Sequence, residues 1–475
     1  MQSLTRGLVS GWAQLGPRFL PFADAASAQM PLSRLLRLSL FQVSVGMALV
    51  LLVGTLNRVM IVELRVPAAL VAVMVALPVL YAPLRALIGY RSDHHRSALG
   101  WRRVPFIWMG TLIQFGGLAV MPFALLVLSG GGQASQWPGW VGPAGAGIAF
   151  LLVGAGLHTV QTAGLALATD LSPVERQPRV VGLMYVMLLA GTILSAFVFG
   201  AFLQDFTPGR LVQVIQAAAV TTLVLNSVAL WKQETRVRGR LSQPADEPSF
   251  GTAWRAYLRG EGVRPRLLAI GLGTLGFGMQ DVLLEPYGGQ VLGMGVGDTT
   301  WLTATLALGG LVGFSVASAV LSRGMDPVRM ARGGALLGVP AFAAVLMAAV
   351  VHSVPLFAVG VLLIGLGGGM FGHGTLTLTM NRAPPDQAGL ALGVWGAVQA
   401  TGAGIAVAAG GIVRDLVAAL ADHGAFGSAL AQPATSYAFV YGIEIVLLVA
   451  TVAVMGALVG PRSAVPVSRL SLQVK

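Results

Sequence analysis

The sequence predicts an all-α polytopic membrane protein, and two features of its composition carry that prediction. Only 10% of the 475 residues are charged and the mean hydropathy is +0.78, whereas a soluble globular chain carries about 25% charged residues. The hydrophobic residues also fall in blocks of roughly 20, the length of a helix that crosses a bilayer core of about 30 Å. The pattern lacks the alternating strands, about ten residues long, that build a transmembrane barrel.

Twelve such blocks follow one another, and we expect each to form one transmembrane helix. A polar segment at 232–265 contains proline and glycine, is typical of a linker, and divides the blocks six and six. The expected organisation is an N-terminal interfacial arm at 1–38, a six-helix half at 39–231, the cytoplasmic linker, a second half at 266–460 and a tail at 461–475. The expected spans are 39–57, 67–88, 104–128, 143–168, 180–203, 211–231, 266–287, 299–321, 331–350, 355–379, 388–411 and 437–460.

Basic residues gather on one side of these spans. Of the 30 Lys and Arg residues, 25 lie in segments on the side of the two termini and four on the other side, while Arg85 lies inside the second span. Because positive charge in short loops marks the cytoplasmic face, we expect both termini in the cytoplasm. The net charge of +12 then belongs to a membrane surface, and nucleic acid is not an expected partner.

Missing motifs exclude several functional classes. The chain has no cysteine, which excludes disulfides, thiolate metal sites and cysteine nucleophiles. It has no GxxxxGK[ST] loop and no HExxH pair, so ATP-driven transport and zinc proteolysis are not expected. We therefore expect no enzyme activity and no metal held directly by the chain alone.

The two halves repeat each other around the fourth and tenth spans. "ATDLSPVERQPRVVGLMYVMLLAGTIL" aligns with "TMNRAPPDQAGLALGVWGAVQATGAGI" at a constant offset of 211 residues, which pairs Asp170 with Asn381 and Gly182 with Gly393. Two six-helix halves repeated in parallel are the plan of the major facilitator fold.

A charged loop between the second and third spans supports the same fold. In "GYRSDHHRSALGWRR" the frame is Gly89, Asp93, Gly100, Arg102 and Arg103, and it resembles the loop signature of the major facilitator superfamily. Gly89 allows the helix to end, and Asp93 can accept hydrogen bonds from basic side chains or a helix N-terminus. The alternative, ordinary positive charge on the cytoplasmic side, accounts for the arginines but leaves the Gly/Asp frame unexplained.

Longer stretches resemble one family in particular. They are "LSLFQVSVGMALVLLVGTLNRVMIVEL" at 38–64, "RSDHHRSALGWRRVPFIWMGTLIQFGGLAVMPFALLVLSG" at 91–130 and "GFGMQDVLLEPYGGQVLGMG" at 276–295. Together they are similar to the PucC/LhaA proteins, the bacteriochlorophyll delivery family of the major facilitator superfamily, over about residues 31–460. The stretch at 17–42 and the loop "VLSGGGQ" resemble the LhaA branch.

The resemblance implies a function, a ligand and a location. It implies an assembly factor for light-harvesting antenna that binds bacteriochlorophyll a and delivers it to antenna polypeptides, with the core antenna LH1 favoured over LH2. A carotenoid is a second candidate ligand. The implied partners are the antenna α and β polypeptides, the reaction centre–LH1 complex and the lipid bilayer, with bacteriochlorophyll synthase and the insertion machinery as further candidates. The implied location is the bacterial inner, intracytoplasmic membrane. The alternative is a proton-coupled secondary transporter that moves a small solute by alternating access.

Two carboxylates in the seventh span are the first candidate site. Asp281 and Glu285 are four residues apart and would share one helix face, with Pro286 and Gly288–Gly289 ending the helix. Two carboxylates this close do not both ionise easily. They are candidates for proton coupling or for an oxygen ligand to a pigment, and Glu285 is a candidate axial ligand to pigment magnesium. The alternative is a structural cap at the membrane edge.

His158 and His373 are the two histidines well inside spans, and they are candidate axial ligands because neutral imidazole binds metals. Gln161 is a further candidate pigment contact on the fourth span. The alternative for the histidines is a hydrogen-bonded helix contact, which the nearby Thr159, Gln161 and Thr375 would allow. Arg85 either extends to the inner surface or lines a cavity, where it would meet a substrate carboxylate or a lipid phosphate.

Overall fold

Every regular element in the described part of the chain is a helix. The computed structural model describes residues 26–27, 30–81, 85, 88, 92, 101–173, 176–234, 258–260, 262–321, 323–382, 388–423, 425, 427 and 432–458. Within these residues, ten helices are long and apolar enough to cross a membrane, or eleven if one bent pair is a single span. The shorter α5 (Ala68–Leu80) starts where the second span is expected, and most of that span beyond Tyr81 lies outside the described residues. The helices thus confirm a polytopic all-α membrane fold.

Most of the helices begin and end within a few residues of the expected spans. α7 runs over Val104–Leu128, the expected range, because Arg103 precedes it and Ser129–Gly131 follow it. The other uninterrupted long helices are α8 (Val141–Asp170), α9 (Gln177–Phe202), α10 (Pro208–Leu230), α14 (Val296–Leu321), α15 (Pro327–Val350), α16 (Val354–Arg382), α17 (Ala388–Asp422) and α18 (Pro433–Leu458).

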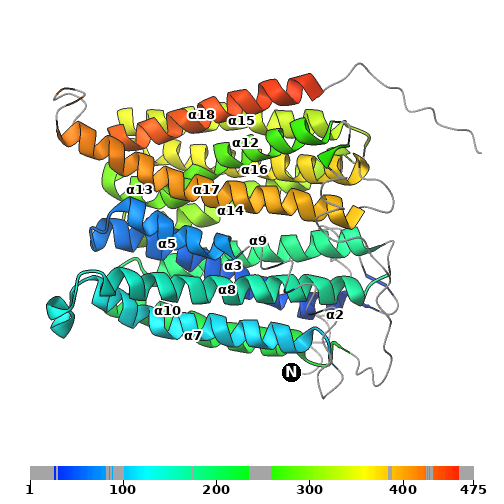
Figure 1. Cartoon of the computed structure of the whole chain (residues 1–475), viewed down its shortest axis with the longest axis horizontal. Coiled ribbons are helices and arrows are strands. Elements are labelled where there is room, and N and C mark those ends of the chain that lie inside the picture. The colour runs from blue at the N-terminus through cyan, green and yellow to red at the C-terminus, as the bar shows by residue number, and fades with distance from the viewer. Residues whose placement is uncertain are drawn as a thin grey trace, which may run out of the picture.

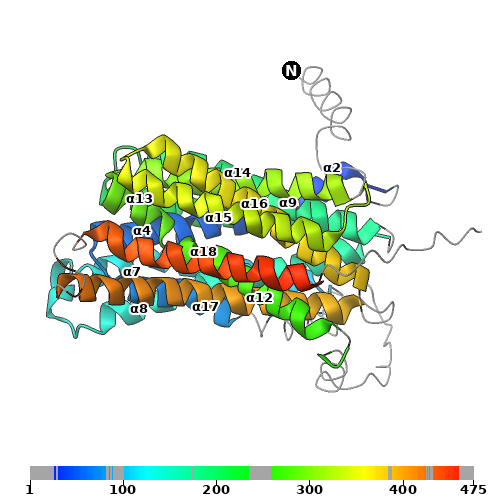
Figure 2. The same cartoon turned by 90° about the horizontal axis from the view of Figure 1, so that it is seen from above.

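The helices form two bundles that lie side by side (Figure 1). The first half, residues 30–234, occupies the lower part of that view, and the second half, residues 258–458, the upper part. Contacts between them run mainly through α5 with α17 and α9 with α14. All the long helices run along one axis (Figure 2). We call the end that carries residues 101–104 and 323–329 the basic end, and the end that carries residues 63–68 and 203–208 the opposite end.

The first span is the most buried and the least regular. It consists of α2 (Leu32–Leu38), α3 (Leu40–Leu49), η2 (Val50–Thr55), α4 (Leu56–Arg58) and η3 (Val59–Glu63), and 83% of its most apolar window is buried. η2 and η3 have the wider π-helical turn, which is rare and occurs mostly at functional sites. The π-helical part of η2 contains Gly54, which faces the second half.

Glycines bring helices into direct backbone contact in both halves. In the first half, a Cβ on Gly156 of α8 would overlap the backbone of Gln114 in α7. In the second half, a Cβ on Gly365 of α16 would overlap the carbonyl oxygen of Leu306 in α14. Small residues allow membrane helices to approach this closely, so the high glycine content of 63 residues supports the packing of both halves.

The expected bounds of two spans are wrong. The first span was expected at 39–57 but runs over Leu32–Glu63. The eleventh span was expected to end at 411, but α17 continues to Asp422. The glycines at the expected end are packing positions, since a Cβ on Gly411 would overlap Ala72 of α5. Beyond them, Arg414 and Asp415 pair with each other at 2.7 Å, so these charges do not end the helix.

Candidate functional site

The seventh span is broken about two-thirds of the way along its length. α12 (Val263–Gly278) and η6 (Met279–Val282) meet α13 (Leu284–Leu292) at a bend of 47°. The backbone N–H of Gln280 donates to Oε1 of Glu444 at 2.8 Å, and Glu444 in α18 is fully buried. Because a break in a membrane helix frees backbone groups that need new partners, this carboxylate stabilises the break. Glu444 was not among the candidates, and its only signal was a lone acid inside an apolar span.

The predicted stacking of Asp281 and Glu285 is wrong. The bend separates them, because Asp281 lies in η6 before the bend and Glu285 lies in α13 after it. Pro286 and Gly288 do not end the helix either. Pro286 occupies the first turn of α13, where its missing N–H removes no helical hydrogen bond. The Asp281 carboxylate accepts a hydrogen bond from the Gln280 side chain and lies within electrostatic range of Glu444.

Glu285 lies where the two halves touch. Its Oε1 accepts a hydrogen bond from Thr303 of α14, and a Cβ on Gly54 of the first span would overlap the same oxygen. Glu285 is 4% exposed, and its Oε2 has no hydrogen-bond partner among the described residues. This unpaired oxygen is itself buried, and the carboxyl group lies within electrostatic range of Arg58 in the first span.

The two intramembrane histidines have unpaired rings. Neither His158 in α8 nor His373 in α16 makes a hydrogen bond to a described residue, and the Nδ1 atom of each is buried. The neighbours expected to pair with them bond elsewhere: Thr159 donates to its own helix at Ala155, and Thr375 donates to Gly372. The hydrogen-bonded helix contact proposed as their alternative role is therefore not formed.

His373 lies beside an aromatic ring and open space. Its ring centroid is 4.2 Å from that of Phe314 in α14, at an interplanar angle of 59°. A Cβ on the preceding Gly372 would meet no heavy atom within 4 Å. The imidazole is partly exposed on α16 and is available to a ligand that approaches along this face.

Arg85 turns into the first half. Its Nε donates to Thr162 Oγ1 and its NH2 donates to Gln161 Oε1, both at 3.1 Å. Gln161 in turn donates to Gln42 Oε1 at 3.5 Å. The alternative in which Arg85 extends to the membrane surface is therefore wrong. The predicted residues Arg85 and Gln161 come together, and His158 shares the face of α8 that carries Thr162.

The charged loop is described only at its end. Gly89, Asp93 and Gly100 lie outside the described residues. Arg102 NH2 and Arg103 Nε contact Asp170 Oδ2 at 3.1 and 3.0 Å. The basic pair thus ties the start of α7 to the end of α8.

Glu234 is a second acid that the sequence did not single out. It follows α10, and its carboxylate accepts hydrogen bonds from the backbone N–H groups of Arg102, Arg103 and Val104 at 2.7 to 3.1 Å. These are the unpaired donors at the start of α7, where a negative charge is favourable. Glu234 therefore links the loop after the sixth span to the third span.

The two halves are hydrogen-bonded toward the opposite end. Between described residues, the side-chain bonds that join the halves all lie in the part of each span nearer that end. The strongest by distance is from the Ala69 backbone N–H at the start of α5 to Asp415 Oδ2 of α17, at 2.6 Å. The full set is Thr55 with Thr300, Asn57 with Val282, Arg58 with Met294, Ala69 with Asp415, Gln204 with Asp298, and Trp301 with Phe197.

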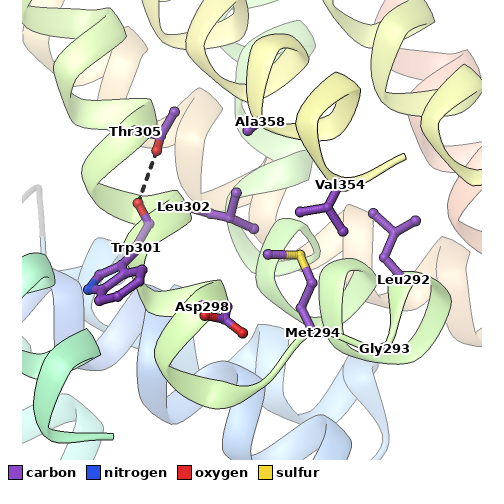
Figure 3. A pocket seen from close by; sticks show the side chains of 9 residues that line it. All are labelled: Leu292, Gly293, Met294, Asp298, Trp301, Leu302, Thr305, Val354 and Ala358. Carbon is purple, nitrogen blue, oxygen red and sulfur yellow. Dashed lines mark hydrogen bonds between the residues drawn. The ribbon is translucent and has the colours of Figure 1, made fainter. Parts of the chain in front are cut away.

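A pocket of about 430 Å³ lies at the opposite end of the second half, between the end of α13, the start of α14 and the start of α16 (Figure 3). Leu302, Met294 and Val354 give it an apolar wall, and Asp298 gives it one charge. None of the predicted site residues lines it. Among the described residues, no group of three His, Asp or Glu side chains could hold a metal ion.

The sequence has close relatives over most of its length. A family model described as PUCC protein matches residues 55–463. The chain belongs to the PucC protein family. This PucC-family chain is 62% identical to Protein PucC of Rhodovulum sulfidophilum over 420 residues, which cover 88% of this chain and 92% of that protein. It is 56% identical to Protein PucC of Cereibacter sphaeroides over 457 residues, covering 96% and 98%.

A more distant relative and a solved structure complete the comparison. The PucC-family chain is 27% identical over 442 residues to a Rhodobacter capsulatus protein named bacteriochlorophyll synthase 44.5 kDa chain, covering 91% of this chain and 96% of that one. Its fold matches a crystal structure of a bacterial homologue of the human lysosomal transporter Spinster in an inward-facing, unoccupied conformation. The TM-score is 0.65 at 15% identity, covering 89% and 95% of the two chains. This likeness confirms the major facilitator fold.

Proposed function

We propose that this PucC-family protein is a non-enzymatic assembly factor for photosynthetic light-harvesting antenna. It binds bacteriochlorophyll a, with a carotenoid as a second ligand, and passes the pigment to antenna α and β polypeptides in the intracytoplasmic membrane, with both termini in the cytoplasm. It serves the core LH1 antenna around the reaction centre in preference to LH2, as the LhaA-like stretches at 17–42 and 127–133 favour. Family membership and the name of the 27% identical relative support the pigment role.

The unpaired ring of His373 is the observation that carries the proposal. A neutral imidazole with no hydrogen-bond partner is a good axial ligand for pigment magnesium, and this one lies inside a transmembrane helix. The open space beside Gly372 and the ring of Phe314 offer room and an aromatic surface to a flat macrocycle. His158, Glu285, Asp281 and Gln161 are further candidate contacts, and Glu285 offers one free carboxyl oxygen.

The test is complementation in a phototrophic host that lacks its own copy of the gene. We expect His373→Leu to lower the near-infrared absorbance of the core antenna in membranes toward the level of the deletion strain, because pigment loses its axial ligand. The matched control is His423→Leu, since His423 is exposed at the opposite end and its loss should leave the absorbance at the wild-type level. Both variants are compared at equal protein level.

Pigment binding is measured directly on the same proteins. Wild-type protein purified from the pigment-making host should carry a near-infrared band that comigrates with it, and His373→Leu should reduce that band per protein. Glu285→Gln should also reduce the band if its free oxygen contacts pigment. Colourless wild-type protein, or normal antenna levels in the His373 variant, would contradict the proposal.

A second candidate function is proton-coupled transport of a small solute. The hydrogen bonds that join the halves toward one end favour it, because alternating access requires one end to be sealed while the other opens. Glu285 lies at the contact between the halves, where a change of protonation would alter that contact. Uptake driven by a pH gradient in liposomes, and lost in Glu285→Gln while colourless protein is recovered from the host, would favour transport over pigment delivery.

A further inference from the structure

The interior of the first half contains a positive charge, Arg85, that pairs with no acid among the described residues. Arg85 makes its two hydrogen bonds to the neutral acceptors Gln161 and Thr162, and no ion pair joins it to any described residue. A charged group inside a membrane span is costly and usually marks a functional contact. The missing partner is therefore the feature to explain.

The guanidinium of Arg85 lies well inside the helical bundle, away from the basic end. Thr162 lies eight residues before α8 ends at Asp170, which is about 12 Å along a helix axis. Its bonds hold the guanidinium at that level. Arg85 remains partly exposed, so a molecule can reach it.

The bonds that Arg85 already makes leave one edge of its guanidinium free. Nε and one N–H of NH2 form the side edge, which Thr162 and Gln161 occupy. NH1 and the second N–H of NH2 form the other edge, and they have no partner among the described residues. Two parallel N–H groups on one edge match the two oxygens of a carboxylate or a phosphate.

The neighbours of Arg85 supply further donors. Gln161 donates to Oε1 of Gln42, and this fixes the Gln42 amide so that its Nε2 is buried and unpartnered. His158 and Tyr185 both lie within electrostatic range of Arg85. The locality is rich in donors from α3, α8 and α9 and contains no acid among the described residues that touch it.

We propose that Arg85, with Gln42 and His158, forms a binding site for the oxyanion of a membrane-soluble ligand. The oxyanion is either the free propionate of a tetrapyrrole that is not esterified or the phosphate of an anionic lipid. The tetrapyrrole source rests on the proposed pigment function, whereas the lipid source does not.

The first arm of the test compares a carboxylate with its ester. Wild-type protein in nanodiscs of neutral lipid is titrated with a zinc chlorin that carries a free propionate and with its methyl ester, and binding is followed by the chlorin fluorescence. We expect the free acid to bind about 10- to 100-fold more tightly than the ester, as for a charge-assisted bidentate contact. Arg85→Gln should abolish this preference by weakening the free acid alone.

The second arm of the test measures bound phospholipid. Wild-type protein and Arg85→Gln are purified from the same membranes, and the anionic phospholipid that remains bound is measured by mass spectrometry. A loss of bound phospholipid in Arg85→Gln, with equal binding of acid and ester, assigns the site to a lipid phosphate. Arg210→Gln is the matched control in both arms, because it removes one positive charge from an exposed pair with Asp205 at the opposite end.

The remaining outcomes decide against the site. Arg85→Lys keeps the charge and covers the case in which Arg85→Gln does not fold, and it should retain part of the preference but lose the bidentate geometry. If wild type and both Arg85 variants bind acid, ester and lipid alike, the oxyanion site is wrong while ester binding keeps the pigment function intact. If wild type binds no chlorin and no phospholipid depends on Arg85, both proposals fail.

Discussion

The two halves share a fold but differ in their buried polar groups. The first half holds the partly exposed Arg85 among neutral amides and hydroxyls, whereas the second half buries the carboxyl groups of Glu285 and Glu444. The carboxylate of Glu444 bonds to backbone and stabilises a broken helix, while the polar groups around Arg85 bond to one another between helices. The duplication therefore preserved the packing of the helices but not the chemistry inside them.

This difference separates structural from functional roles. Glu444 replaces a backbone partner lost at the bend in the seventh span, so removing it should reduce stability. The described bonds of Arg85 go to two side chains in the interior of α8, so its substitution should change ligand binding more than folding. Substitutions in the two halves, compared by their effect on the free energy of unfolding, test this distinction between structural and functional residues.

The largest effect should come from the feature that the halves share, close packing at glycine. Gly156→Ala and Gly365→Ala each place a methyl group against backbone of the neighbouring helix. We expect each to lower the free energy of unfolding by about 1 to 3 kcal/mol, measured by denaturant titration in detergent. Gly372 lies in α16 like Gly365 but faces open space. Gly372→Ala should therefore leave the free energy of unfolding unchanged or raise it by at most about 1 kcal/mol. If only one of the two substitutions, Gly156→Ala or Gly365→Ala, lowered the free energy of unfolding, the two halves would not share the same close packing.

The sequence predicted this shared framework well. Hydrophobic blocks give the helices because each must cross the same thickness of bilayer, and α7 matches its expected range at both ends. The offset of 211 residues carries the end of α8 to the end of α16 within one residue, and the start of α9 to the start of α17. Length and repetition are local properties that a single chain displays directly.

The next largest effect should appear where the halves differ. Glu444→Leu leaves the backbone N–H of Gln280 without its acceptor, and we expect it to lower the free energy of unfolding by about 2 kcal/mol. Glu444→Gln keeps an acceptor oxygen and should cost less.

The comparison in the first half is Asn226 in α10, which is also fully buried and bonds to Ser44 and Thr111. Those two hydroxyls also contact carbonyl oxygens of their own helices, so Asn226→Leu should cost only about 0.5 kcal/mol. Equal costs for Asn226→Leu and Glu444→Leu in the same titration would remove the proposed difference between the halves.

The broken helix and the candidate site could be predicted only in part, because their causes are distant in sequence. Within 266–287, Pro286 and the polar residues before it mark the neighbourhood of the bend, but they do not show what stabilises it, since Glu444 lies 164 residues beyond Gln280. Arg85 presented two alternatives because its partners lie 76 and 77 residues away. His158 and His373 were found because an ionisable group inside a span is conspicuous, and the same rule would have found Glu444.

The smallest effect concerns the contact between the halves. Asp415→Ala removes the carboxylate that accepts the Ala69 N–H at the start of α5. This should lower the free energy of unfolding by about 1 kcal/mol, as for other helix caps.

Spin labels measure the contact directly. The chain has no cysteine, so labels can be placed at Val73→Cys and Leu416→Cys, two exposed positions on α5 and α17. Their distance distribution should broaden in Asp415→Ala, because one of the six side-chain bonds that join described residues of the two halves is lost. The control is Asp205→Ala, which breaks an ion pair within the first half at the same end and should leave the distance distribution narrow. Broadening in both variants, or in neither, would show that Asp415 does not hold the halves together.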